Sequence, residues 1–286
     1  MSINKAEVLV NALPYIRQFR GKTVVVKYGG NAMIDETLKA AVIQDVILMS
    51  WVGIRTVLVH GGGPEIESLL KRVGKESRFI GGLRHTDEET MEIVQMVLCG
   101  KINKDICSLI QRSGGRALGL CGIDGALLKA RRIKSEGEDL GLVGEVETVD
   151  ARLLNDVLDS GVIPVLSSVA FGIAEDEGRT LNVNADTAAA KVAAALGAEK
   201  LILMTDVQGI LRDLDDPSSL IKQIRRSELE DLKKSGIVNK GMIPKVDCCQ
   251  LALDAGVKRT HILDGRLPHS LLIELFTDEG IGTMIF

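Results

Sequence analysis

Short apolar runs alternate with segments of helical periodicity along this chain. Runs rich in Val, Ile and Leu predict buried strands, and apolar residues at every third or fourth position predict helices. One predicted strand is centred on Val24–Val26, and the others cover residues 55–60, 117–121, 162–169, 201–204, 257–263 and 282–286. The predicted helices cover residues 4–19, 36–52, 88–111, 151–160, 185–197, 229–234, 241–255 and 271–276. This alternation predicts a largely parallel sheet with helices on both faces.

The first predicted strand ends in residues suited to phosphate. Three consecutive valines, Val24–Val26, indicate a strand buried on both faces, and Lys27, Gly29 and Gly30 follow them. The lysine supplies a positive charge, and the glycines let backbone amides approach an anion closely. A core strand that ends in an ordinary glycine turn explains this stretch about equally well.

A second glycine-rich turn follows the strand predicted at 55–60. Three glycines, Gly61–Gly63, precede Pro64, which suits the first turn of a helix. Three glycines exceed what a strand-to-helix turn needs, which favours a site for small anionic groups. The same motif occurs in esterase oxyanion holes, but this chain lacks the GxSxG nucleophile that an esterase requires.

Two cations further along the chain are candidates for binding anions. Arg84 lies in the glycine-rich segment 80–86, where its guanidinium could grip a carboxylate in bidentate fashion. A lone arginine is nevertheless more often solvated. Lys245 opens the helix predicted at 241–255 and is a second candidate for phosphate, although an exposed helix lysine is the default interpretation.

Polar residues also gather at two other element ends. Asn182, Asn184 and Asp186 lie at the entrance of the alanine-rich helix, where capping explains only one of them. The strand at 201–204 ends in Thr205 and Asp206, the position at which nucleotides bind in open α/β sheets. The sequence therefore places candidate ligand-binding groups at several strand ends.

Two further segments have uncertain placement. Residues 134–150 are polar and glycine-rich with alternating Val143, Val146 and Val149, which predicts a β-hairpin or a flap. The first helix, with Asn4 as its cap, precedes the first strand. It either packs on a neighbouring subunit or folds back on its own domain, and the sequence slightly favours the second arrangement.

Composition narrows the function classes. The 286 residues suffice for one large α/β domain or two fused lobes, and a net charge of -4 argues against a nucleic-acid surface. We find no membrane-spanning run and expect no signal peptide, so a cytoplasmic protein is predicted. The five cysteines form no CxxC pair and the four histidines have no ligand spacing, so we expect reduced thiols and no structural metal.

The order of motifs resembles the amino acid kinase family, and within it the branch that phosphorylates N-acetyl-L-glutamate. The motifs are KxGG, HGGGP, GLR-H-T-D, LNVNAD, TDVxGI, GMIPK and GIGT. The resemblance implies a three-layer αβα sandwich around a central, mainly parallel sheet. It also implies phosphoryl transfer from ATP to the γ-carboxylate of N-acetyl-L-glutamate, an early step of arginine biosynthesis. One departure is His85, where the family usually has an apolar residue.

The resemblance also implies roles for individual residues. Lys27 and Lys245 match the lysines that neutralise the transferring phosphoryl group, and Asp186 matches the aspartate that organises them. The positions matching substrate-binding residues are Gly62, Gly63, Arg84 and Asn182. The positions matching nucleotide-binding segments are Gly29, Gly30, Thr205, Asp206, Gly209, Gly241 and Met242.

The implied reaction needs little from side-chain bases. A carboxylate acceptor is already ionised at neutral pH, so no general base is required. Bringing an anion to a polyanion instead demands positioning and charge compensation. We expect Mg²⁺ to bridge the ATP phosphates with mostly water ligands, and the chain has no Walker A motif.

Family members that carry an N-terminal helix resemble arginine-inhibited hexamers. The resemblance therefore implies a trimer of dimers inhibited by L-arginine, with residues 1–20 as an oligomerisation helix. Residues 21–184 are expected to form an acetylglutamate-binding lobe and residues 185–286 an ATP-binding lobe. Candidate effector residues are Tyr15, Lys200, His269 and Glu274. A nitrogen-signalling protein is left open as a partner.

Several alternatives stay open on the sequence alone. Another amino acid kinase, acting on aspartate, glutamate, carbamate or a carrier-bound amino acid, would share most of these motifs. A non-catalytic arginine-sensing or nucleotide-sensing subunit would bind without turnover, although it would not need both lysines and Asp186. A nicotinamide-dependent dehydrogenase is disfavoured because GxGxxG is absent.

Overall fold

The computed structural model describes residues 5–33, 35–134, 137–239 and 241–286. Its helices are α1 Lys5–Phe19, α2 Glu36–Trp51, α3 Gly63–Arg72, α4 Glu88–Gln95, α5 Asn103–Arg112, α6 Ala151–Asp159, α7 Ala185–Ala195, α8 Leu229–Lys234, α9 Ile243–Asp254 and α10 Ser270–Phe276. A π-helical segment, Met96–Ile102, joins α4 to α5. None of the helices in these ranges combines the length and hydropathy that crossing a bilayer requires.

The strands form one large sheet and one small hairpin. Strands of the large sheet are β1 Thr23–Tyr28, β2 Arg55–His60, β5 Ala117–Gly122, β6 Leu128–Arg132, β7 Val143–Val149, β8 Ile163–Gly172, β9 Thr180–Val183, β10 Lys200–Thr205, β11 Gln223–Ile224, β12 Arg259–Asp264 and β13 Thr283–Ile285. The order within the described residues is β11-β13-β12-β10-β1-β2-β8-β6-β7-β9, with β5 also paired to β8. The hairpin is β3 Phe79–Ile80 with β4 Leu83–Arg84.

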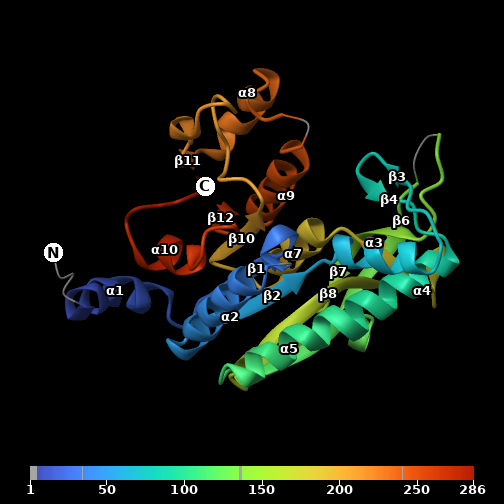
Figure 1. Ribbon diagram of the computed structural model, residues 1–286, viewed down its shortest axis with the longest axis horizontal. Coiled ribbons are helices and arrows are strands. Elements are labelled where there is room, and N and C mark those ends of the chain that lie inside the picture. The colour runs from blue at the N-terminus through green and yellow to red at the C-terminus, as the bar shows by residue number, and fades with distance from the viewer. Residues whose placement is uncertain (1–4, 34, 135–136, 240) are drawn as a thin grey trace.

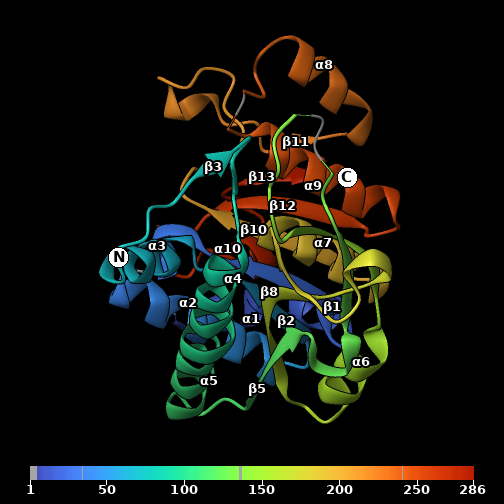
Figure 2. The same ribbon diagram turned by 90° about the vertical axis from the view of Figure 1, so that its right-hand side faces the viewer.

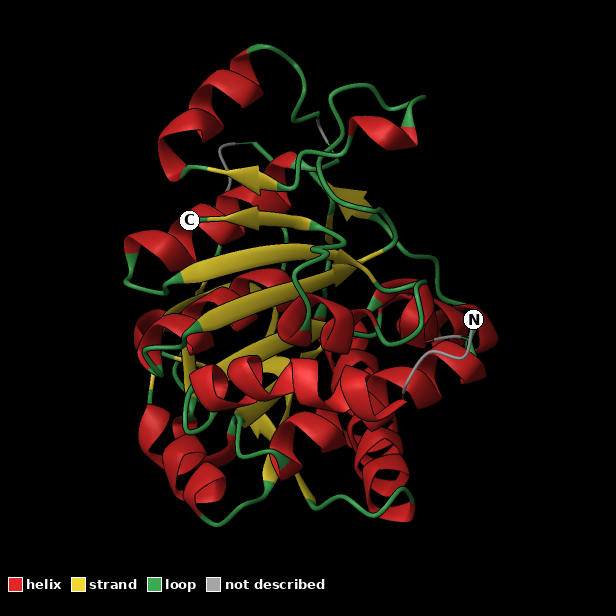
Figure 3. Cartoon of the chain, turned by 90° about the vertical axis from the view of Figure 1, so that its left-hand side faces the viewer, coloured by secondary structure: helices red, strands yellow, loops and turns green. Residues whose placement is uncertain are grey.

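Most neighbouring strands of the large sheet run parallel, as the sequence predicts. The antiparallel pairs are β12 with β13, β6 with β7, and β8 with β9. Figure 3 shows the strands stacked as a twisted sheet with helices on either side. The α/β class and the three-layer arrangement are therefore confirmed.

Two groups of helices cover the two faces of the sheet. In Figure 2, α2, α4, α5 and α10 lie on one side of the strands, and α6, α7 and α9 lie on the other. Contacts agree with this view, since α7 packs on β1, β2 and β10, whereas α2 packs on β2, α5 and α10. The central strands are thus enclosed on both faces.

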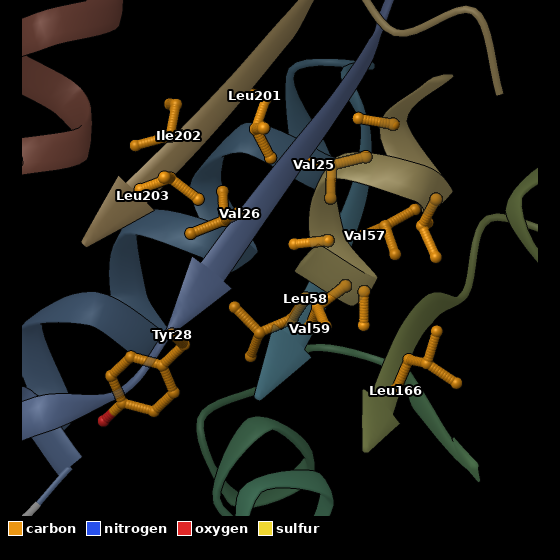
Figure 4. Close-up of a cluster of buried hydrophobic side chains, with 14 of the residues drawn as sticks. Val25, Val26, Tyr28, Val57, Leu58, Val59, Leu166, Leu201, Ile202 and Leu203 are labelled. Carbon is orange, nitrogen blue, oxygen red and sulfur yellow. The ribbon is translucent and has the colours of Figure 1, made fainter. Parts of the chain in front are cut away.

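The core lies around β1 and its two neighbours. Val24–Val26 have no exposed surface, and the facing residues of β2 and β10 are equally buried. Figure 4 shows Val25 and Val26 among Leu201–Leu203 on one side and Val57–Val59 on the other. Burial on both faces explains why these strands have continuous apolar runs instead of an alternating pattern.

The pairing registers bring the ends of the central strands to one edge. Tyr28 on β1 pairs with His60 on β2, and Lys27 pairs with Leu203 on β10. Strand β1 lies between β2, which follows it through α2, and β10, which follows β9 through α7. Such a switch point is where ligands bind in open α/β sheets.

The hairpin or flap predicted for residues 134–150 is observed as a hairpin whose first strand lies further upstream than predicted. In the described part of this range the strand is Val143–Val149, and its antiparallel partner is β6, which lies upstream at Leu128–Arg132. Leu128 and Ala130 are buried while Lys129 and Arg131 lie outward, so β6 does alternate with a period of two. The basic residues of this short strand masked that pattern.

The first helix packs on the body of the protein only through its C-terminal part. Figure 1 shows α1 beside α10 at the edge of the molecule. Phe19 is buried, and Ala12, Tyr15 and Ile16 contact the core, but Val8, Leu9, Val10 and Leu13 are exposed. Folding back on its own domain therefore accounts for half of the helix. The predicted cap Asn4 lies outside the described residues.

Candidate active site

Two lysines from distant parts of the chain contact one carboxylate. The Nζ atom of Lys27 lies 3.0 Å from Oδ1 of Asp186, and the Nζ atom of Lys245 lies 2.9 Å from Oδ2. Only 12% of the Asp186 side chain is exposed. Both oxygens of the carboxylate are thus engaged by ammonium groups at a mostly buried position.

Each of these three residues is held by the start or end of an element. Lys27 is the next-to-last residue of β1, and Asp186 lies in the first turn of α7. The side chain of Asn184 caps α7 by accepting hydrogen bonds from the amides of Asp186 (2.8 Å) and Thr187 (3.3 Å). Asn184 is therefore the cap, and Asp186 is left available for the lysines. Lys245 lies in the first turn of α9.

The lysines keep Asp186 ionised. Burial alone would raise the pKa of this carboxyl, but the charges of Lys27 and Lys245 outweigh it and hold the pKa below its ordinary value. A buried carboxylate between two cations fixes both ammonium groups in place. The cluster has a net positive charge, as an anionic substrate requires.

The glycines after β1 are required by close contacts. A Cβ atom at Gly29 would lie 2.8 Å from Nζ of Lys27. Gly30 has a φ of +69°, and a Cβ there would lie 2.7 Å from a carboxylate oxygen of Asp206. Any side chain at these positions would displace the lysine or the acidic residue, so this turn is more than an ordinary glycine turn.

A cavity of about 550 Å³ opens beside Lys27 and Asp186, and we call it the acceptor cavity after the substrate predicted for its residues. It brings together all four residues predicted to bind the acceptor substrate. Its lining includes Lys27, Gly29, Gly30, Gly62, Gly63, Arg84, Asn182 and Asp186. Among its walls are also Glu67, Phe79 and Ser168, which the sequence analysis did not single out.

Arg84 is buried in the wall of this acceptor cavity. Its guanidinium donates hydrogen bonds to Glu67 (2.8 Å), to the carbonyl of Gly63 (3.2 Å) and to Ser77. It also lies over the ring of Phe79, 4.6 Å from the ring centroid. The arginine is therefore oriented by its neighbours and not solvated, which leaves a fixed cation facing the cavity.

The three-glycine turn forms a second wall of the acceptor cavity. Gly63 opens α3, with Pro64 in its first turn as predicted. A Cβ at Gly62 would lie 2.1 Å from Ile102 Cδ1 and 2.8 Å from Leu98 Cδ2, so the π-helical segment packs against bare backbone. The nearby Asn182 is held by a hydrogen bond to Thr86 (3.1 Å).

A second cavity, of about 310 Å³, opens beside both Lys27 and Lys245, and we call it the nucleotide cavity after the ligand predicted for its residues. It is lined by Lys27, Gly30, Met204, Thr205, Asp206, Val207, Gly209, Leu211, Leu214, Asn239, Gly241, Met242 and Lys245. All the residues assigned to the nucleotide except Gly29 are thus brought together here. Lys27 and Gly30 belong to both cavities, so the two spaces meet at the lysine pair.

Loop geometry explains several of the residues that were predicted to bind the nucleotide. The hydroxyl of Thr205 hydrogen-bonds to backbone atoms of Val207 and Leu263, so it shapes the turn after β10. Gly209 has a φ of +146°, and a Cβ there would lie 2.6 Å from the Thr283 hydroxyl. The side chain of Asn239 accepts from the amides before α9 and was missed by the sequence analysis.

The four candidate effector residues lie around the contact of α1 with α10. Tyr15 donates a hydrogen bond to Asp278, which follows α10. Lys200 lies 4.9 Å from the ring centroid of Phe19, and burial lowers its pKa to about 8 while Glu274 opposes that change. These contacts make a polar cluster beneath the first helix, outside both cavities.

The remaining members of this cluster pair with histidine or aspartate. Glu274 lies 2.9 Å from Nδ1 of His261 and accepts a hydrogen bond from the amide of Ile281. His269 precedes α10 with a φ of +59°, and its Nδ1 lies 2.6 Å from Asp45 on α2.

His85, the residue that departs from the family pattern, lies elsewhere. Its backbone N–H donates a hydrogen bond to the carbonyl of Arg78.

Sequence comparison identifies relatives that cover almost the whole chain. This chain is 57% identical over 281 residues to acetylglutamate kinase from Clostridium kluyveri, and the alignment covers 98% of both chains. It is 55% identical over 293 residues to acetylglutamate kinase from Heliobacterium modesticaldum, covering 99% of this chain and 98% of that one. These similarities confirm the resemblance predicted from the order of motifs.

Solved structures show the same fold. N-acetylglutamate synthase from Neisseria gonorrhoeae superposes with a TM-score of 0.86 at 32% identity over 99% of this chain, which spans 63% of the synthase. Carbamate kinase from Giardia lamblia, at 17% identity and a TM-score of 0.66 over 93% of this chain and 98% of that one, shares the fold. A profile of the amino acid kinase family matches residues 22–264. The chain therefore belongs to the amino acid kinase family.

Proposed function

We propose that this protein transfers the γ-phosphoryl group of ATP to the γ-carboxylate of N-acetyl-L-glutamate, an early step of arginine biosynthesis. The observation that carries the proposal is the lysine pair on Asp186, which lies where two cavities meet. The relatives named acetylglutamate kinase support the choice of acceptor. The product is an acyl phosphate with ADP as the leaving group.

Charge compensation is the main task of this site. The acceptor carboxylate and the ATP phosphates repel each other, and both must approach within bonding distance. Lys27 supplies positive charge from the acceptor side and Lys245 from the nucleotide side. Asp186 holds both lysines and keeps them from moving apart. The carboxylate attacks as it is, so no residue has to remove a proton.

The two cavities support a division of the chain into lobes. The acceptor cavity is lined by residues between 27 and 186, and most of the second cavity is lined by residues between 204 and 245. In this proposal residues 21–184 bind acetylglutamate and residues 185–286 bind ATP. Arg84 and Asn182 would hold a carboxylate and the amide of the acceptor.

The donors at the site fit a metal ion that arrives with the nucleotide. No group of three or more His, Cys, Asp and Glu is placed to hold a metal in the described ranges. Asp186, the carboxylate at the centre, is already neutralised by two lysines. Mg²⁺ bound to the ATP phosphates and water would reduce their charge, while the lysines and backbone amides act on the transferring group.

Turnover with defined acceptors tests the proposed reaction. ADP release should be measured with N-acetyl-L-glutamate, L-glutamate, L-aspartate and carbamate in turn, with hydroxylamine added to trap an acyl phosphate. We expect acetylglutamate to be preferred by at least tenfold in kcat/KM. ATP binding without turnover on any acceptor would favour the non-catalytic sensing subunit instead.

Substitution of Arg84 tests how the acceptor is bound. Arg84→Lys replaces a planar fork by a single ammonium, so the KM for acetylglutamate should rise roughly tenfold or more while the KM for ATP stays within about twofold. Arg78→Lys, an exposed arginine paired with Glu138, is a matched control that should change neither constant. Equal effects on both substrates would contradict the assignment.

The same proposal includes feedback inhibition by L-arginine and a hexameric assembly. The exposed apolar residues of α1, namely Val8, Leu9, Val10 and Leu13, support a helix that packs on another copy. The polar cluster beneath α1 and α10 supports a site for a charged effector. A structure of the Neisseria gonorrhoeae synthase, at 30% identity and a TM-score of 0.80 over 99% of this chain and 65% of that one, contains L-arginine.

Oligomer mass and inhibition should change together. Leu9→Glu should reduce a hexamer to dimers in light scattering and weaken inhibition by L-arginine. Lys234→Glu, at an exposed residue in the last turn of α8, is a control that should leave the mass unchanged. A wild-type protein that stays dimeric at micromolar concentration would contradict the hexamer. We also place the reaction in the cytoplasm, because all five cysteines are free thiols.

A further inference from the structure

His60 is buried directly before the three-glycine turn and has no part in the proposed chemistry. It ends β2 and has no exposed surface. It does not line either cavity, whereas Gly61, Gly62 and Gly63 all line the acceptor cavity. A polar ring completely enclosed beside a substrate-binding turn needs hydrogen-bond partners, and those partners indicate what it does.

The ring of His60 connects the glycine turn to α5. Its Nδ1 lies 3.0 Å from the carbonyl oxygen of Gly61, and its Nε2 lies 3.2 Å from Nδ2 of Asn103. Because the carbonyl oxygen of Gly61 can only accept, the proton belongs on Nδ1, and Nε2 is left as an acceptor facing Asn103. His60 therefore donates to Gly61 in a single tautomer.

Asn103 is itself fixed by further contacts. Its Nδ2 lies 2.8 Å from the carbonyl of Val165 and 3.2 Å from that of Leu120, and its Oδ1 accepts from Lys104 (3.0 Å). The histidine is thus oriented by an amide that bridges α5 to β5 and β8. Burial lowers the pKa of His60 to about 4, and the charge of Lys104 also lowers it, so the ring is neutral at pH 7.

Holding the Gly61 carbonyl also sets the direction of the next amide. The carbonyl of Gly61 and the N–H of Gly62 belong to one trans peptide plane, in which they point in opposite directions. Because the carbonyl points to the buried His60 ring, the Gly62 N–H points away from that ring, and Gly62 itself lines the acceptor cavity. Within the described residues this N–H has no backbone acceptor, so it is available to an anion.

Packing around the three-glycine turn limits its backbone conformations, but it does not select between the two orientations of the Gly61–Gly62 peptide. Gly62 is pressed against Leu98 and Ile102, and a Cβ at Gly61 would lie 3.3 Å from the Cβ of Ala185. Glycine nevertheless permits a flipped peptide, because no side chain has to move with it. A donor behind the carbonyl is therefore needed to choose between the two orientations.

We propose that His60 is a positioning residue that locks the orientation of the Gly61–Gly62 peptide. In this orientation the Gly62 amide donates to an anion in the acceptor cavity, either the attacking carboxylate or the phosphoryl group that is transferred. This inference rests on the proposed kinase function and adds a residue that acts through the turn. Without the donor the peptide samples the flipped orientation, which presents a carbonyl oxygen to an anion. That change weakens both acceptor binding and stabilisation of the transition state.

Two substitutions of His60 by amide side chains distinguish the effect of losing the Nδ1–H donor from the effect of losing the imidazole ring. His60→Asn places an N–H near the position of Nδ1 and keeps the donor to Gly61. His60→Gln places its amide near Nε2, which retains contact with Asn103 and loses that donor. We expect kcat/KM for acetylglutamate to fall about tenfold or more in the glutamine variant, short of the roughly 10²–10³-fold expected when a donor is removed outright. The asparagine variant should stay within about threefold of wild type.

ATP binding and thermal melting serve as internal controls. The KM for ATP should stay within about twofold in both variants, because His60 does not line the nucleotide cavity. The proposal is overturned when the folded glutamine variant retains wild-type kcat/KM, or when a folded asparagine variant loses as much as the glutamine variant. If the glutamine variant fails to fold, near-normal kcat/KM in the asparagine variant supports the donor role and a large loss in that variant contradicts it.

Calorimetric binding of acetylglutamate to the same proteins separates this inference from the proposed function. A wild-type protein that binds acetylglutamate without turnover contradicts the kinase assignment alone. In that case the order of acceptor affinities, wild type and asparagine variant above glutamine variant, still supports the role of His60. Equal affinities in all three proteins combined with equal turnover contradict the role of His60 alone.

Discussion

The Nζ atom of Lys245 lies 2.9 Å from a carboxylate oxygen of Asp186, although 59 positions separate the two residues in the chain. Asp186, in the first turn of α7, lines the acceptor cavity, and Lys245, in the first turn of α9, lines the nucleotide cavity. The pair therefore fixes the spacing of the two cavities as well as the position of a charge. A carboxylate shared by two lysines brings both cations together despite their mutual repulsion.

Removing the charge of Asp186 should separate the two lysines. In Asp186→Asn the ammonium groups of Lys27 and Lys245 lose their common partner and repel each other, so kcat should fall by roughly 10²-fold or more. Asp254→Asn removes a carboxylate from α9 that pairs with Arg226 at the surface, and it should leave kcat within about twofold. Steady-state kinetics at saturating ATP and acetylglutamate distinguish the two. A fully active Asp186→Asn enzyme would show that the shared carboxylate is unimportant.

The shape of the cation at position 27 should matter as much as its charge. The Lys27→Arg substitution places a planar guanidinium where the Nζ atom now lies between Gly29 and Asp186, with too little room for the fork. We expect kcat to fall by roughly 10²–10³-fold, similar to Lys27→Ala. The same exchange at Lys101, an exposed lysine that pairs with Asp105, is the control. Retained turnover in Lys27→Arg would mean that only net charge is needed.

The central elements could be predicted from the sequence because they are enclosed on both faces. The valines of β1 and the apolar run of β2 predict strands at these places, and the observed strands at 23–28 and 55–60 agree. The glycine turns and helix starts that follow them are marked by Gly, Pro and Asn. Parallel strands bring such ends to one edge, which explains why most candidate residues line the two cavities.

Other features depend on contacts that a single sequence does not show. The strand β6 alternates lysine and arginine with buried Leu128 and Ala130, a pattern that a polar loop also fits. Glu67 and Asn239 have their roles only through Arg84 and the backbone before α9. The partial packing of α1 depends on where α10 lies, and nothing in the local pattern of residues 5–19 encodes that position.

Two neighbouring glycines should respond differently to alanine. In Gly62→Ala the new Cβ would lie 2.1 Å from Ile102 Cδ1, so the π-helical segment has to shift, and we expect a loss of about 1–3 kcal/mol in the free energy of unfolding. Gly63 has no atom within 4 Å of such a Cβ, so Gly63→Ala should unfold close to wild type. Chemical denaturation of both variants measures the difference. Similar unfolding free energies would show that the contact relaxes without strain.

Asp45 gives the fold a stability change in mildly acidic solution. This residue of α2 is fully buried, with one carboxylate oxygen 2.6 Å from His269 and the other without a hydrogen-bond partner in the described residues. Burial raises its pKa to about 6, although His269 and the amides of Leu271 and Leu272 act in the opposite direction. The folded protein therefore binds a proton at this site more tightly than the unfolded chain does.

The sign of the effect follows from that difference. A carboxyl whose pKa rises on folding from 3.8 to about 6 contributes stability that is fully present below pH 3.8 and is lost as the pH rises through 6. The free energy of unfolding of the wild type, relative to Asp45→Asn, should fall by roughly 2–3 kcal/mol between pH 4 and pH 7. His269→Asn should steepen the fall, because the imidazole favours the charged carboxylate. Urea denaturation at several pH values measures these curves, and parallel curves for wild type and Asp45→Asn would exclude Asp45 as the group that titrates.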